Sequence, residues 1–392
     1  MPPPQPGEHL IASFVGDTSG PTLIVIGSIH GNEPAGSIAL DNVADQLTNL
    51  TERIRGRVYF LRGNTRALAC GRRFVEHDLN RIWTSNELVQ AGCLGEYDTS
   101  ELRELSELDH LFDSILITAM DEVFIVDLHS TSANGIPFAT VGDTLRNRSF
   151  AKKFPTTILL GIEEQLDGTM LEYLNNAGAV TLGFEGGQHL ATSTVSNHEA
   201  VIWHALAAAG VLDISDVPEP EIQKQKLDAE NRGPRLYEVR YRHAITEQDE
   251  FEMKPGFKNF DPVPEGMVLA NDKNGVIRAT ESGLLLMPLY QKLGNDGFFI
   301  GREISPFWLR VSGLLRGVGI QKIMHFLPGV ERDPVDPGTL IVNTNIARLF
   351  PLQLFHLLGF RRIRWTGKKL VVSRRRHDTS GPFKWKVNVG QQ

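Results

Sequence analysis

Two histidines and one glutamate in the first third of the chain have the residue types and positions of a zinc site. His30 and Glu33 follow the apolar, β-branched run Leu23–Ile26, and His129 follows a second such run, Val123–Leu128. Runs of this kind are typical of strands buried on both faces, and functional groups gather where such strands emerge into loops. Two histidines and one carboxylate leave one open position on a tetrahedral zinc ion, which defines a catalytic rather than a structural site.

A hydrolytic zinc site also needs a base that takes a proton from the attacking water. Glu185 ends the apolar run Val180–Phe184 and precedes two glycines, which permit close approach of substrate or backbone. A carboxylate is costly to bury there without a partner, so we expect Glu185 to be this base rather than a surface residue in a turn. Asp127 can orient the imidazole of His129 or cap a turn. His189 could be a fourth ligand or proton donor, but we favour a residue that only supports the ligands or one that is incidental.

Cations that could assist the reaction cluster in the segment Asn64–Trp83. Arginine pairs bidentately with carboxylates and stabilises developing oxyanions. Taken alone, the segment would be interpreted as a charged loop, but beside a zinc site it predicts an anionic substrate. Its polar residues of interest are Arg66, Arg72, Arg73, Arg81, Asn64 and Asn80.

Alternating strands and helices must position these side chains. Over residues 1–215 the pattern predicts an α/β domain in which helices cover both faces of a mostly parallel sheet. The expected strands are Leu23–Ile26, Val58–Arg62, Val123–Leu128, Thr157–Leu160 and Val180–Phe184, and the expected helices are Gly36–Leu47, Ser100–Ala119, Thr169–Asn176 and Val195–Ala209.

The rest of the chain has a different pattern. Residues 213–232 are polar and predict a linker or an excursion of the chain. Short β-prone pieces separated by turn residues predict a small β domain over residues 233–304. Residues 305–392 form an extension with an apolar helix, Ile346–Leu358, and a basic hairpin. We interpret the helix as packed rather than as a dimer face or membrane surface. We likewise interpret the hairpin as solvated rather than as a site for phosphate, membrane or nucleic acid.

Composition sets broad limits on the function. The chain has 392 residues, of which 41% are hydrophobic and 22% charged, as in ordinary soluble proteins. Its two cysteines and its start, which lacks signal-peptide features, predict a cytoplasmic protein without a disulfide framework. No apolar run approaches the roughly 18 residues of a membrane span. The net charge of −7 identifies no partner, we expect no nucleic acid, and the oligomeric state stays open, a homo-oligomer included.

Four motifs, GSIHGNEPAG, RRFVEHDLNR, VDLHST and GFEGG, occur in this order along the chain. Together they resemble the succinylglutamate desuccinylase and aspartoacylase family of the zinc carboxypeptidase-like superfamily. The resemblance is close over about residues 20–200 and looser to about residue 304. It implies a three-layer αβα catalytic domain with a mixed sheet, followed by a smaller mostly-β domain that narrows the cleft.

The resemblance also implies a cofactor and a reaction. By motif match, His30, Glu33 and His129 would hold one Zn²⁺ per chain, and Glu185 would be the general base and later the acid. The implied reaction is hydrolysis of the amide bond of a small N-acyl amino acid, a C–N bond other than a peptide bond. The alternatives are a carboxypeptidase or esterase with the same site and, in another class, a non-catalytic metal- or ligand-binding module, against which Glu185 argues.

The same match assigns residues to the substrate and shows one departure. Arg73 would polarise the scissile carbonyl, Asn80 and Arg81 would bind a substrate carboxylate, and Tyr290 would add a hydroxyl from the β domain. Relatives place a further arginine shortly before the catalytic glutamate to hold a second carboxylate. Residues 154–185 of this chain contain no Lys or Arg and several acids. The departure favours a cationic or neutral amino-acid moiety over a dicarboxylate.

Overall fold

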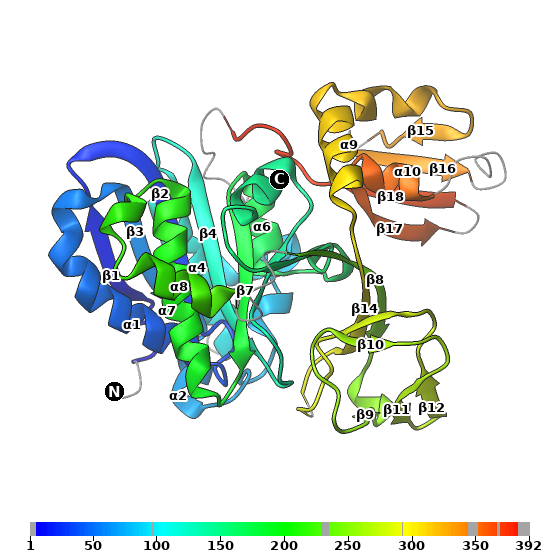
Figure 1. Ribbon diagram of the computed structural model, residues 1–392, viewed down its shortest axis with the longest axis horizontal. Helices are drawn as coiled ribbons and strands as arrows, with labels where there is room; N and C mark the ends of the chain where they lie inside the picture. Colours follow the sequence, from blue (N-terminus) through cyan, green and yellow to red (C-terminus); the bar gives the residue numbers. More distant parts are fainter. Residues whose placement is uncertain are drawn as a thin grey trace.

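An eleven-stranded mixed sheet runs through the molecule (Figure 1). The computed structural model describes residues 5–95, 98–228, 235–291, 293–334, 336, 338–343, 352–366 and 369–382, with only the backbone at 352, 353 and 362–366. In sheet order, the strands are β1 (Leu10–Val15), β3 (Arg55–Arg62), β2 (Thr18–Gly27), β4 (Val123–Thr131), β7 (Val180–Gln188), β5 (Phe138–Val141), β6 (Thr157–Leu160), β8 (Leu236–Ala244), β14 (Asp296–Glu303), β13 (Gly283–Leu286) and β10 (Asp261–Val263).

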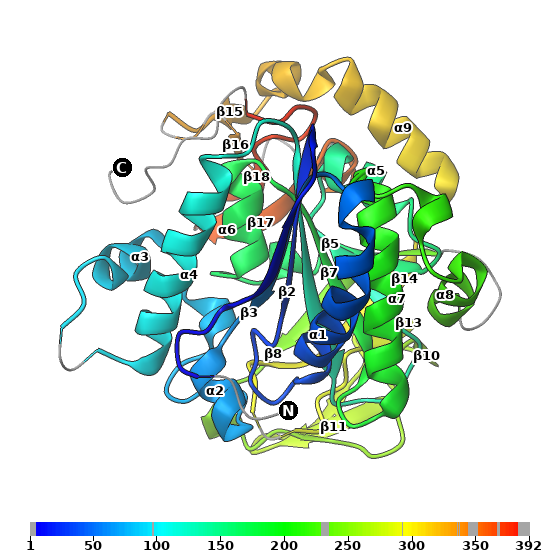
Figure 2. The ribbon, with the colours of Figure 1, turned by 90° about the vertical axis from the view of Figure 1, so that its left-hand side faces the viewer.

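Helices cover both faces of this sheet (Figure 2). Helices α1 (Ala35–Leu47) and α7 (Thr192–Ala209) lie on one face, and α4 (Ser100–Leu116) and α6 (Met170–Ala177) lie on the other. Alternate residues of β2 enter the two cores, Leu23 and Val25 on the side of α1 and α7, Ile24 and Ile26 on the side of α4. The apolar run is continuous because the strand is buried on both faces. The predicted three-layer fold is confirmed.

The prediction for residues 1–215 is confirmed in outline, since each expected strand and helix has a counterpart, while shorter elements were missed. The missed elements are β1, β5, α2 (Thr65–Cys70), α3 (Ser85–Ala91) and α5 (Leu145–Ala151). The linker predicted over residues 213–232 is wrong in part, because it contains α8 (Pro220–Leu227), whose Leu227 is buried in the core beneath α7. The buried residues of this otherwise polar helix are Gln223 and Leu227.

The β-prone pieces after residue 234 form two groups. Strands β8, β14, β13 and β10 extend the large sheet through the parallel pairing of β6 with β8. A separate three-stranded sheet contains β9 (Glu252–Met253), β11 (Val268–Asp272) and β12 (Gly275–Arg278). The smaller mostly-β part is therefore present, and it shares backbone hydrogen bonds with residues 5–228, which contain the predicted catalytic residues and are called the catalytic part below.

The C-terminal region, defined here as residues 306–382, carries α9 (Pro306–Gly317), the 3₁₀ helix η6 (Ile320–Phe326) and a four-stranded sheet. The strands of this sheet are β15 (Val330–Arg332), β16 (Thr339–Asn343), β18 (Lys369–Arg374) and β17 (Phe360–Thr366). Helix α10 (Leu352–Leu357) lies within the predicted apolar helix, whose first residues fall outside the described part. No helix in the described part of the chain combines the length and apolarity needed to cross a bilayer.

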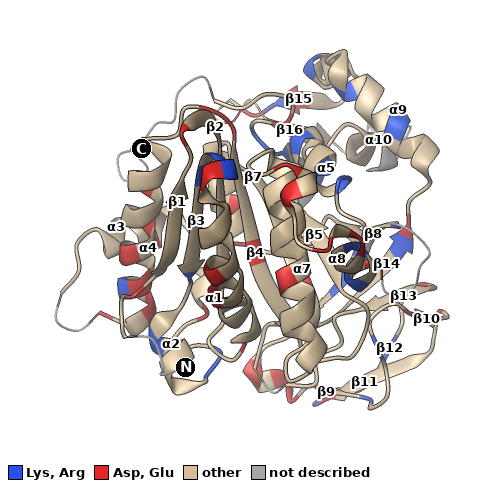
Figure 3. Ribbon diagram, turned by 60° about the vertical axis from the view of Figure 1, so that its left-hand side comes forward, with Lys and Arg blue, Asp and Glu red and all other residues tan. Residues whose placement is uncertain are grey.

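The basic hairpin exists as the antiparallel pair β17–β18, but the interpretation of it as solvated is wrong for two of its arginines. The side chains of Arg361 and Arg375 are 9% and 8% exposed and bind carboxylates of the catalytic part. Charge is also unevenly distributed over the helices. Helices α1 and α7 carry acids and no Lys or Arg, whereas α9 carries arginines and no acid (Figure 3).

Candidate functional site

The three predicted metal ligands meet at the carboxyl ends of two adjacent parallel strands. Strand β2 pairs with β4 up to Gly27 and Leu128, so the chain leaves both strands at the same edge of the sheet. Ser28 turns the chain with a left-handed φ of 59°, and its hydroxyl donates to the Glu33 carbonyl oxygen. This strained turn brings His30 and Glu33 back over the strand ends.

The ligand atoms of His30, Glu33 and His129 lie within 4.8 Å of one another. His30 Nδ1 is 3.0 Å from Glu33 Oε1, and His129 Nδ1 is 3.3 Å from Glu33 Oε2. His30 and Glu33 are 4% and 3% exposed. Two imidazole nitrogens and one carboxylate converging on a point at this separation form a donor set that zinc prefers. The residues present therefore fit Zn²⁺.

The protonation states agree with a cation site. Burial raises the pKa of Glu33, but His30 and His129 outweigh it and hold that pKa well below its ordinary value. Burial lowers the pKa of His129, but Asp127 and Glu33 outweigh it and hold that pKa well above its ordinary value. The cluster thus attracts positive charge, which a divalent cation would supply in place of a proton.

A carboxylate lies behind each of the two imidazole rings that could bind a metal. Asp127 Oδ2 lies 2.8 Å from His129 Nε2, and Asp78 Oδ1 lies 3.2 Å from His30 Nε2. Each contact fixes the ring so that Nδ1 faces Glu33. Of the two roles considered for Asp127 from the sequence, its contact fits the orientation of the His129 ring. The Asp78 contact was missed, although Asp78 stands in the DLNR motif.

Glu185 lies opposite His129 on the neighbouring strand, in register across β4 and β7. It is 7% exposed, and its Oε2 has no hydrogen-bond partner among the described residues. Burial raises the pKa of Glu185 to about 8. A Cβ at the next residue, Gly186, would lie 2.4 Å from His198 Nε2, so only glycine allows the strand to pass here. A buried carboxyl with a free oxygen and a pKa near neutrality is suited to proton transfer.

Arg73 reaches the same centre from the segment after α2. Its guanidinium pairs with Asp78 at 2.9 Å, and Nη1 lies 3.7 Å from Glu33 Oε1. Glu101 of α4 holds the segment by accepting hydrogen bonds from the backbone N–H groups of residues 75, 76 and 77. Nothing in the sequence marks Glu101, because its role depends on a long-range contact with this loop.

Asn80 and Arg81 lie in the cavity wall with partners of their own. Asn80 Oδ1 accepts from the Met170 N–H at 2.9 Å. Arg81 Nη2 lies 3.1 Å from Asp296 Oδ2, and the other oxygen of Asp296 accepts from Arg242 at 2.5 Å. The guanidinium predicted to bind a substrate carboxylate therefore already contacts a carboxylate of β14.

One cavity of about 140 Å³ joins these groups. That volume is below the roughly 300–1,000 Å³ of typical ligand pockets, so the cavity suits a small substrate. All the predicted catalytic, metal and substrate residues line it except Tyr290, whose hydroxyl bonds the backbone of Lys254 and Phe257. Its neighbour Gln291 lines the cavity and accepts from Asn32 at 3.1 Å.

Other polar residues named from the sequence have structural contacts. His189 Nδ1 is 2.7 Å from the hydroxyl oxygen of Ser130. The backbone N–H of Ser130 in turn donates to the Glu33 carboxylate. Arg66 pairs with Glu104 and Glu107 at 2.8 Å each. His9, Glu104 and Glu107 form a second group with ligand-like spacing. The Arg66 guanidinium already supplies positive charge to the two carboxylates of that group. We therefore assign the group a structural role rather than a metal-binding one.

Glu163 is a buried acid in the cavity wall, at 4% exposure, and burial raises its pKa to about 7. Because the folded protein holds this proton more tightly than the unfolded chain, Glu163 stabilises the fold at low pH, and this contribution is lost between about pH 4.5 and 7. We expect Glu163→Gln to reduce the fall in unfolding free energy between pH 5 and pH 8 by about 2–3 kcal/mol. Denaturant titrations of both proteins measure this, and identical pH profiles would contradict it.

Comparison with known proteins identifies the domain that carries this site. Residues 19–208 match the model described as the succinylglutamate desuccinylase/aspartoacylase catalytic domain. Residues 19–208 therefore carry a catalytic domain of the succinylglutamate desuccinylase/aspartoacylase type.

Relatives in this family cover the chain to different extents. The succinylglutamate desuccinylase of Pseudomonas fluorescens (strain Pf0-1) is 26% identical over 269 residues, which cover 65% of this chain and 74% of that protein. The succinylglutamate desuccinylase of Pseudomonas putida is 33% identical over 98 residues, which cover 25% of this chain and 28% of that protein. The second match therefore spans less than a third of the relative's length.

Solved structures of the family share the fold. The succinylglutamate desuccinylase/aspartoacylase of Rhodobacter sphaeroides superposes with a TM-score of 0.56 at 18% identity, covering 75% of this chain and 88% of that one. The product-bound ectoine utilization protein EutE of Ruegeria pomeroyi gives 0.53 at 18% identity, with 74% and 87% covered. At 18% sequence identity, these similarities establish a shared fold alone.

Proposed function

We propose that the protein is a zinc-dependent amidohydrolase that cleaves a small N-acyl amino acid into a carboxylate and a free amine. The convergence of His30, Glu33 and His129 beside the free carboxyl oxygen of Glu185 carries this proposal. A binding module would need the ligands but no carboxyl group held next to them. The free, exposed Cys70 and Cys93 further support a reducing compartment such as the cytoplasm.

Five residues that line the cavity have defined roles in the proposed reaction. A zinc ion held by His30, Glu33 and His129 would supply Lewis acidity and a lowered pKa for water. Glu185 takes the proton from the attacking water and later delivers it to the departing amine, and its raised pKa suits both directions of transfer. The Arg73 guanidinium, which stays charged, stabilises the negative charge that develops on the carbonyl oxygen.

A hydrolysis screen tests the function. The zinc-loaded protein would be assayed on acetyl and succinyl derivatives of acidic, neutral and basic amino acids, with Glu185→Gln as the control. Activity on a subset of the panel that disappears in the control supports the deacylase. No activity on any member, with zinc bound, would contradict it and direct attention to peptide and ester substrates.

The pairing of Asp296 with Arg81 predicts how selectivity can be changed. Asp296 lines the cavity and occupies the guanidinium that a substrate carboxylate would need. Asp296→Asn removes the competing charge, so we expect KM for anionic substrates to fall about tenfold, as a charge-assisted contact becomes available. KM for neutral substrates should change little. Steady-state kinetics on the two classes measure this, and an equal change for both would contradict it.

A further inference from the structure

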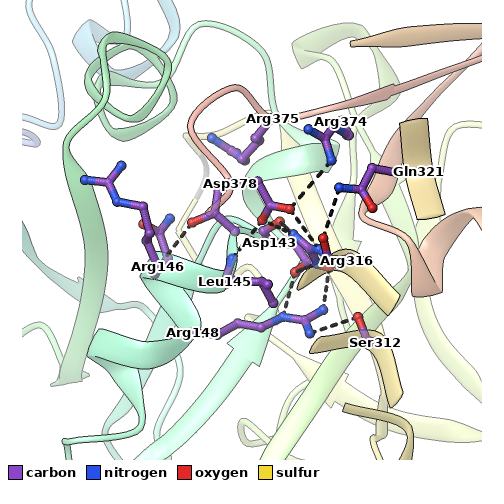
Figure 4. A network of polar contacts seen from close by, with 12 residues as sticks. Asp143, Leu145, Arg146, Arg148, Ser312, Arg316, Gln321, Arg374, Arg375 and Asp378 are labelled. Carbon is purple, nitrogen blue, oxygen red and sulfur yellow. Dashed lines mark hydrogen bonds and ion pairs between the residues drawn. The ribbon is translucent and has the colours of Figure 1, made fainter. Parts of the chain in front are cut away.

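Buried ion pairs join the C-terminal region to the catalytic part. Asp143, which follows β5, pairs with Arg316 of α9 at 2.9 Å and with Arg361 of β17. Asp378 also pairs with Arg316 (Figure 4). The side chains of these four residues are at most 9% exposed. Charges buried to this degree are costly unless they are paired, so the pairs fix the C-terminal region in one place.

Arg375 extends this network toward the cavity. It follows β18, and its Nε lies 2.7 Å from Glu164 Oε1 while its Nη2 lies 3.1 Å from Glu163 Oε2. Its Nη1 donates to Asn175 Oδ1 at 3.3 Å. Glu164 Oε1 also accepts from the backbone N–H of Asp143 at 2.8 Å. One guanidinium therefore holds both acids of the 161–166 loop.

That loop forms part of the cavity wall through Ile162, Glu163 and Leu166. It lies in the stretch 154–185, which contains no Lys or Arg of its own. The positive charge that balances Glu163 and Glu164 comes instead from Arg375, far along the chain. The C-terminal region thus determines the charge of a wall that the substrate contacts.

We propose, on the basis of the function above, that Arg375 is a positioning residue for the substrate. It fixes the 161–166 loop and compensates the acidic charge that this loop brings to the cavity. Without it, Glu163 and Glu164 share an uncompensated negative charge at the cavity wall, and the loop loses the guanidinium contact that holds it. Because Arg375 contacts none of the metal ligands or Glu185, its loss changes substrate binding and leaves the chemical step intact.

Arg375→Gln tests this, with Arg376→Gln as a matched control that removes the same charge from the exposed neighbouring residue. We expect Arg375→Gln to raise KM for anionic N-acyl amino acids at least about tenfold, with KM for neutral ones and all kcat values within about threefold. Adding Glu163→Gln to the variant should restore KM for the anionic substrates. A uniform loss of kcat without rescue would reduce Arg375 to a structural role and overturn the proposal.

Hydrogen exchange of the 161–166 backbone, measured without substrate, gives a second readout. Exchange should be faster in Arg375→Gln than in the parent and unchanged in Arg376→Gln. If the parent hydrolyses no member of the panel, the proposed function fails, yet exchange still decides whether Arg375 holds the loop. Equal exchange and equal KM in parent and variant would overturn the positioning role. Should Arg375→Gln fail to fold, Arg375→Lys keeps the charge without the bidentate contact and should show a smaller KM effect of the same selectivity.

Discussion

Glu185→Gln is expected to lower kcat by roughly 10²–10⁴-fold, the range typical of a general acid–base group, while the protein keeps its metal. Glutamine has nearly the shape of glutamate but cannot accept a proton from water. The three metal ligands come from other residues, so the cavity should stay assembled. Initial rates on the best substrate of the panel and metal content by elemental mass spectrometry measure the two effects.

The control for this variant is Glu265→Gln, the same exchange at an exposed position outside the cavity, which should match the parent. A Glu185→Gln protein as active as the parent would show that another group is the base. Loss of metal together with activity would instead show that Glu185 helps to hold the cation.

His129→Ala should abolish both metal binding and turnover. It removes one of three ligand atoms, and it also leaves the Asp127 and Glu33 carboxylates without the ring that lies between them. Buried carboxylates without a partner repel one another, so a loss of stability is expected as well. Metal content and the shift of the unfolding temperature on adding Zn²⁺ measure this. The parent should be stabilised by zinc, since a ligand that binds the folded state raises its stability, and the variant should not.

His204→Ala provides the comparison, because His204 lies on α7 and does not line the cavity. It should bind zinc and turn over substrate like the parent. Full metal content in His129→Ala would mean that the cation is held by other residues.

The catalytic part of the fold could be predicted because its signals are local. The apolar runs within β2, β4 and β7 are each followed within a few residues by a polar residue of the site. Strand β5 escaped prediction although β6, which has the same length of four residues, was predicted. Asp78 and Glu101 escaped because their importance comes from contacts that form only once distant segments meet.

The C-terminal region shows the limit of such inference more clearly. A cluster of arginines is ordinarily solvated, because charged side chains are rarely buried without partners. The partners of Arg361 and Arg375 are Asp143, Glu163 and Glu164, which precede them by about two hundred residues. The acidic residues of the catalytic part and the basic residues of the C-terminal region are both visible in the sequence. Which acid pairs with which base is not.

The continuity of the large sheet restricts how the molecule can move. Strand β8 is hydrogen-bonded to β6 on one side and to β14 on the other, and β14 carries Asp296 into the cavity wall. Moving the smaller β part away from the rest of the sheet as a rigid body would break the hydrogen bonds between β6 and β8. Entry and exit of small molecules must then depend on the loops at the rim, whose motion leaves every strand in register. Turnover in such a framework would be timed by loop opening rather than by rigid-body closure.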